Sequence, residues 1–154
     1  MSTQALIERW MADIQLDPSA LNPDQRLCSF RIFDSLDITL EWPEASDDLF
    51  VVIDLMATQG GELRRKRLDE AMRLNAFGLL TRGAVIGWDE VNDRLVLSYR
   101  LGLERVDTAT LNSAVMNLAE IAQDVQERLR FEQDVVMAQK VARSGAGWFQ
   151  PIQA

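Results

Sequence analysis

The change of apolar period within residues 68–101 constrains the fold of this chain more than any other feature of its sequence. In residues 68–80 the apolar side chains recur about every 3.6 positions, which is the spacing of an α-helix. Beyond Gly83 they form a short apolar run, and in residues 94–101 they occupy alternate positions, as in a half-buried strand. The polar segment between the two runs, residues 89–93, is too short for a crossover helix. The stretch therefore predicts a helix followed by an antiparallel hairpin.

The rest of the chain completes an α-βββ-α-ββ-α order. The predicted elements are a helix near residues 3–14, strands at 27–33, 36–42 and 49–56, a helix from 62 to 80, strands at 84–88 and 94–101, and a helix from 108 to 129. The strand at 49–56 is almost continuously apolar, as expected of a central strand covered on both faces. This order predicts an α+β domain with a twisted antiparallel sheet covered by helices.

We expect a single domain over residues 1–143, because a chain of 154 residues suits one hydrophobic core. The last helix can extend toward Ala142, and residues 144–154 follow as a flexible tail that carries the aromatic pair Trp148-Phe149. No apolar run approaches the ~20 residues that span a bilayer. No signal peptide opens the chain. The expectation is a cytoplasmic protein without a membrane span.

The composition argues against most classes of enzyme. The chain contains no histidine and a single cysteine, Cys28, so the commonest acid–base group and an ordinary zinc site are both missing. No nucleotide-binding, hydrolase or metalloprotease motif occurs, and no pair of carboxylates stands apart from the other acids. We therefore expect no catalytic activity, no cofactor and no metal. A carboxylate-based enzyme remains the least favoured alternative.

The distribution of charge argues against nucleic acid as a partner. The formal net charge is −8, and residues 1–60 hold eleven acidic side chains against three basic ones. The basic side chains gather in residues 64–67, Arg-Arg-Lys-Arg. Such a tetrad can bind phosphates, but the field of the whole protein would repel a nucleic-acid backbone. We expect a solvated helical turn whose long side chains shield apolar surface.

The helix at 62–80 carries more apolar surface than a monomer needs. Apolar or small side chains occupy much of its circumference, whereas a helix that covers a sheet needs only one apolar stripe. A two-fold contact with a second copy is the commonest way to bury the excess. The alternative is a wider stripe that lies deep in the core of a monomer. The predicted homodimer interface consists of Leu68, Met72, Asn75, Ala76, Phe77, Leu79 and Val85.

The element order, the small acidic chain and the segment Arg73–Leu80 resemble the class I type III secretion chaperones, the Tir-chaperone family. Residues 83–89 and 93–97 fit the same pattern, and the likeness extends over residues 3–130. The resemblance implies an ATP-independent, cytoplasmic bacterial homodimer. Such a protein binds the N-terminal segment of a secreted effector in extended, non-globular form and keeps it competent for secretion. The secretion ATPase is a further candidate partner.

The resemblance also implies that the effector adds to the sheet as a strand, with apolar pockets for alternate side chains. The first helix and the first two strands offer more apolar side chains than one core face needs, and we predict that a subset forms an exposed patch. The candidate effector-binding residues are Trp10, Phe30, Ile32, Phe33, Ile38, Leu40 and Trp42. Two other roles stay open: a regulator that titrates a transcriptional activator or anti-activator of the secretion system, and a structural dimerisation or adaptor module.

Overall fold

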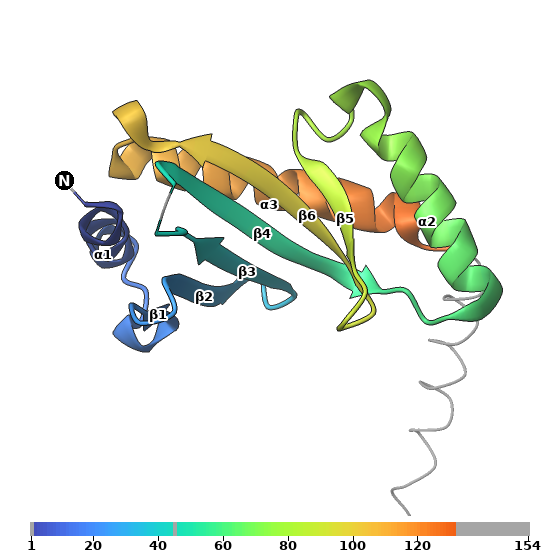
Figure 1. Ribbon diagram of the computed structural model, residues 1–154, viewed down its shortest axis with the longest axis horizontal. Coiled ribbons are helices and arrows are strands. Elements are labelled where there is room, and N and C mark those ends of the chain that lie inside the picture. The colour runs from blue at the N-terminus through green and yellow to red at the C-terminus, as the bar shows by residue number, and fades with distance from the viewer. Residues whose placement is uncertain (1, 45, 132–154) are drawn as a thin grey trace, which may run out of the picture.

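Six antiparallel strands form one sheet, and three helices pack against it (Figure 1). The structure is a computed structural model that describes residues 2–44 and 46–131. Within these residues the helices are α1 (Thr3–Asp13), α2 (Gly61–Asn75) and α3 (Thr108–Leu129). The strands are β1 (Leu21–Asn22), β2 (Leu27–Ile32), β3 (Leu36–Glu41), β4 (Asp48–Ala57), β5 (Val85–Asp89) and β6 (Arg94–Gly102). Single 3₁₀ turns lie at Pro18–Ala20, Ala76–Gly78 and Leu103–Arg105.

The strand order across the sheet is β1-β2-β3-β4-β6-β5. This arrangement confirms the α+β fold with its α-βββ-α-ββ-α order, to which the structure adds the two-residue strand β1 within a segment that was expected to be a loop. The predicted domain boundary at residue 143, the extension of the last helix and the tail at 144–154 all lie outside the described residues.

The hydrophobic core lies between one face of the sheet and the helices. Alternation in β3 places Leu36, Ile38 and Leu40 in this core, and register carries the row from Ile38 through Ile53 to Leu97. Helix α3 runs along the covered face, as Figure 1 shows. Helices α1 and α3 are joined where the indole nitrogen of the buried Trp10 donates a hydrogen bond to Asn112 Oδ1 at 3.3 Å.

Within the described residues strand β4 is fully covered on one face only, which corrects the expectation from its continuous apolar run. Its residues alternate between buried and half-buried positions along the whole strand. Phe50 and Val52 belong to the half-buried set and share a face with Thr39 and Ser98 of the neighbouring strands. Their polar neighbours keep this face compatible with water, so the apolar run reflects a half-exposed face with large side chains rather than a second core.

Helix α2 is shorter than the predicted helix at 62–80. It ends at Asn75, because Ala76 is extended and the two residues after it are left-handed, with φ +64° at Phe77 and +62° at Gly78. Glycine after a helix ends it in this way at low cost, whereas a phenylalanine there is strained. As a result Phe77, Leu79 and Leu80 lie on a loop and not on a helix face.

The basic residues at the start of α2 are only partly the solvated turn that was expected. Arg65 is exposed and pairs with Glu62 at 2.7 Å. Arg67 is buried, and its guanidinium donates to the main-chain oxygens of Ala57 at 2.8 Å and Leu129 at 3.4 Å. It therefore ties the end of β4 and the last turn of α3 to α2, which is a structural role rather than a surface one.

Candidate functional site

A group of apolar side chains lies exposed on α2, on the loop at 76–84 and on β5. Met72 is 72% exposed, Phe77 94% and Leu79 80%. Single exposed apolar side chains are ordinary, but several on adjoining segments mark a surface that meets another protein. We refer to this group as the α2–β5 surface, and its members are Met72, Ala76, Phe77, Leu79, Leu80 and Val85.

Two main-chain hydrogen bonds close the loop at 76–84, which carries the exposed Phe77 and Leu79. Gly83 N–H donates to Gly78 O at 3.2 Å, and Ala84 N–H donates to Thr81 O at 2.9 Å. Within this loop the side chain of Thr81 is fully buried. Phe77 lies in this loop with a left-handed backbone, a conformation that is strained for a bulky residue. The loop is therefore a hydrogen-bonded segment that exposes Phe77 and Leu79 to solvent.

Five of the seven residues predicted for a dimer interface belong to the α2–β5 surface, and the other two face their own chain. Leu68 packs against the core. Asn75 bonds to the main chain of Ile86 in β5. The prediction missed Leu80, although it continues the apolar run after Leu79 and could have been found there.

The outer edge of β2 is the second candidate surface. β1 pairs only with Leu27 and Cys28, so in the described part of the chain no strand pairs with residues 29–32 on that side. Phe33, directly after β2, is 51% exposed in a left-handed turn with φ +52°. Phe30 and Ile32 are half-buried and pack against the core, so only their outer parts are accessible. We refer to this edge with Phe30, Ile32 and Phe33 as the β2-edge surface.

The other four candidate effector-binding residues are core residues, which corrects their expected exposure. Trp10, Ile38, Leu40 and Trp42 are all buried. Ile38 and Leu40 alternate onto the covered face of β3, and Trp10 stacks against Phe30 with ring centroids 5.4 Å apart. The first helix and strands thus use most of their apolar side chains to build the core, and of the seven candidates Phe33 alone is exposed.

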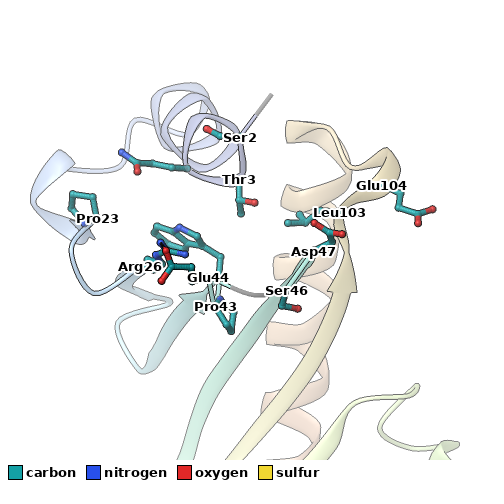
Figure 2. Close-up of a pocket in the computed structure, with 12 residues that line it drawn as sticks. Ser2, Thr3, Pro23, Arg26, Pro43, Glu44, Ser46, Asp47, Leu103 and Glu104 are labelled. Carbon is teal, nitrogen blue, oxygen red and sulfur yellow. Dashed lines mark ion pairs between the residues drawn. The ribbon is translucent and has the colours of Figure 1, made fainter.

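A polar hollow of about 610 Å³ lies at the end of the molecule where α1 begins (Figure 2). Ser2 and Thr3 of α1, the segments after β3 and before β4, and the turn after β6 form its walls. Arg26 and Glu44 both line the hollow and form an ion pair at 2.9 Å. Among the described residues no cluster of acidic and cysteine side chains has the arrangement of a metal site. Polar or charged side chains make up most of the lining of the hollow.

The pKa shifts of Cys28 and Asp93 arise from burial and from structural hydrogen bonds. Burial raises the pKa of the Cys28 thiol to about 11, so the thiolate needed for nucleophilic attack is scarce at neutral pH. A hydrogen bond from the Thr58 hydroxyl, helped by Arg64, holds the pKa of Asp93 below its ordinary value. The ion pair between Arg64 and Asp93 joins α2 to the β5–β6 turn. Arg64 also lies over the ring of Trp88, with its Cζ atom 5.7 Å from the ring centroid.

Comparison with known proteins gives a family and a shared fold. The model of the Tir chaperone protein (CesT) family matches residues 5–126. Comparison with curated proteins gives no match. No helix in the described residues is long and apolar enough to cross a membrane.

Three solved complexes contain chains of similar structure. A chain of the HopA1–SchA chaperone–effector complex is 19% identical, with a TM-score of 0.62 over 80% of this chain and 92% of its own. A chain of the ExsC–ExsE complex is 16% identical, with a TM-score of 0.66 over 86% and 99%. The structure of the Yersinia pestis type III secretion chaperone SycH with a stable fragment of YscM2 gives 16% identity and a TM-score of 0.58 over 79% and 97%. At these identities the likeness establishes the fold.

Proposed function

The chain belongs to the Tir chaperone protein (CesT) family, and we propose that it is an ATP-independent, cytoplasmic chaperone for a type III secreted effector. It binds the N-terminal segment of that effector and keeps it extended and competent for secretion. The observation that carries this proposal is the unpaired outer edge of β2 beside the exposed Phe33. The proposal describes a binding protein and not an enzyme.

An extended effector segment would add to the sheet along residues 29–32. Main-chain groups on the outer edge of β2 would pair with it, while Phe30, Ile32 and Phe33 contact its apolar side chains. A segment whose main chain is already paired cannot fold on itself, which is the condition that secretion requires. Ordering the segment costs conformational entropy, so the contact must be long and partly apolar.

The working unit is a homodimer formed through the α2–β5 surface. The support for this proposal is the number of apolar side chains that a single chain leaves in water there, Phe77 and Leu79 above all. A dimer also presents two β2-edge surfaces, so that one effector can engage both and bind more tightly than to either alone. The secretion ATPase is a further partner in this proposal, without an assigned surface.

Co-expression tests the effector-binding role. The probe is the N-terminal region of the secreted protein encoded beside this chain's gene, tagged and purified together with the chain. We expect the two to co-purify and protease treatment to leave a protected, extended effector fragment. Phe33→Asp should abolish co-purification, whereas Gln25→Asp, which places a charge in the exposed turn before β2, should not.

Equal binding by both variants would contradict the assignment to the β2 edge. A partner that proves to be a transcriptional activator or anti-activator, with no secreted protein bound, would favour the regulatory alternative. Identification of the co-purified protein by mass spectrometry separates these two outcomes.

A further inference from the structure

An apolar groove opens between β6 and α3, beside the loop at 76–84. Its volume is about 340 Å³, and its walls are formed by Tyr99 and Leu101 of β6 and by Ala114, Leu118 and Ile121 of α3. Arg82 of the loop lies at its margin. None of the residues that line this groove is acidic. The groove therefore offers a mostly apolar surface without acidic groups on a protein of net charge −8.

The groove stays open because β5 is shorter than β6. β5 pairs with β6 only from Arg94 to Ser98, while β6 continues to Gly102. In the described part of the chain, residues 99–102 thus have no strand beside them on that edge, and their side chains on the helix side are only half-buried. Figure 1 shows β6 running on past the start of β5 along α3.

The side chains that could fill such a groove lie next to it but point elsewhere. Phe77 and Leu79 belong to the same loop as Arg82, and both are almost fully exposed. They do not enter the groove of their own chain, because a side chain in a groove would be covered. The segment that carries them, residues 76–83, contains no acidic residue either.

We propose that in the homodimer Phe77 and Leu79 of one protomer insert into the β6–α3 groove of the other, and that the partner returns the same contact. This inference rests on the proposed homodimer and specifies how it is built. A two-fold interface makes every contact twice, so a knob and a groove on adjoining parts of one surface can satisfy each other reciprocally. Two copies of charge −8 repel each other, and they meet best where neither surface carries acids. The strained backbone at Phe77 has a role in this contact, because it directs the ring away from its own chain.

Disulfide mapping tests the contact. Cys28 is the one cysteine and is buried, so a Cys28→Ser background leaves the introduced thiols as the only reactive ones. A tagged Phe77→Cys chain is mixed with an untagged Asn117→Cys chain, in which the new thiol lines the groove. We expect the oxidised pair to run at twice the single-chain mass on a non-reducing gel, linked between positions 77 and 117. The control pair, Phe77→Cys with Gln25→Cys, should not cross-link.

A second measurement does not depend on cross-linking. Ala114→Glu places a carboxylate in the groove and should raise the dimer dissociation constant at least about tenfold. Ala109→Glu, exposed on the first turn of the same helix, should leave it unchanged. A dimer that cross-links only between two copies of position 77, or that tolerates Ala114→Glu, would overturn the inference while the dimer stands; an effector or the chain's own tail would then be the occupant to test. A protein that is monomeric by light scattering would overturn the proposed dimer itself.

Discussion

Asn75 and Ile86 are joined by two hydrogen bonds that fix the end of α2 to the outer edge of the sheet. Ile86 N–H donates to Asn75 Oδ1 at 2.8 Å, and Asn75 Nδ2 donates to the Ile86 main-chain oxygen at 2.9 Å. One side-chain amide thus takes the place of a neighbouring strand at the outermost position of the sheet, where unpaired main-chain groups invite aggregation. The same pair positions the loop at 76–84, so the α2–β5 surface depends on it.

Asn75→Ala should lower the free energy of unfolding by about 1–3 kcal/mol, because it removes both bonds and leaves the Ile86 main chain to water. Asn75→Asp keeps the acceptor for Ile86 N–H but turns an oxygen toward the Ile86 oxygen, and it should destabilise the fold at least as much at neutral pH. Urea unfolding measures both changes. The control Gln123→Ala, exposed on α3, should stay within about 0.5 kcal/mol of the natural chain; equal stability of all three variants would show that the Asn75 bonds contribute nothing.

Phe33→Asn should separate stability from binding. Phe33 and Asp34 both have positive φ in the β2–β3 turn, where asparagine is favoured and a bulky residue is strained. We expect the free energy of unfolding to rise by about 1 kcal/mol, while co-purification of the effector weakens because an apolar contact is lost. Phe33→Leu keeps the strain and the apolar contact and should change neither quantity much. A decrease in stability on Phe33→Asn would mean that the ring packs as a core residue.

Arg67→Lys should be costly although it keeps the charge. The buried guanidinium reaches main-chain oxygens from two separate elements, and a single ammonium cannot bond to both in the same geometry. The free energy of unfolding should fall by about 2 kcal/mol or more. Arg65→Lys, two positions earlier and exposed, should change it by less than about 0.5 kcal/mol. Similar values for the two variants in urea unfolding would show that burial of Arg67 does not matter.

Cys28 should make the fold less stable in alkali. Burial raises the pKa of its thiol from its ordinary 9.0 to about 11 in the folded state. Above pH 9 the unfolded chain releases this proton and the folded chain keeps it, so the unfolded state gains and stability falls as pH rises toward 11. Cys28→Ala should flatten the pH dependence of the unfolding free energy across this window. A matching curve for both chains would contradict the raised pKa, as would rapid labelling of the native thiol at pH 8.

Met72→Glu should dissociate the proposed homodimer without unfolding the chain. The side chain is exposed on the outer side of α2, so the carboxylate is harmless in a single chain but buries a charge in the α2–β5 interface. Light scattering should give the mass of one chain and circular dichroism an unchanged spectrum. Met116→Glu, on the exposed side of α3, should keep the mass of two chains. A dimeric Met72→Glu variant would place the interface elsewhere.

Local patterns in the sequence determined the elements of this fold. The period of the apolar residues distinguished helices from strands on either side of Gly83, and alternation in residues 36–42 assigned the buried face of β3. These signals are local, because side-chain direction follows from the helix or strand geometry of a few neighbouring residues. The apolar surplus after Leu68 was also evident in the sequence, and five of the seven residues predicted for a dimer interface are exposed.

The tertiary structure decided what the apolar residues meet. The sequence pattern predicted an exposed surface that included four residues now found in the core. These residues are Trp10, Ile38, Leu40 and Trp42, and packing of the helices buries them. The inward position of Asn75 depends on its hydrogen bonds to Ile86 on another element. The left-handed turn at Phe77 and the unpaired edge of β2 also follow from the packing of the chain and not from a local pattern. A sequence pattern records how apolar a side chain is and which way it points. Whether it is covered depends on which elements fold against it, and that is settled only by packing of the whole chain.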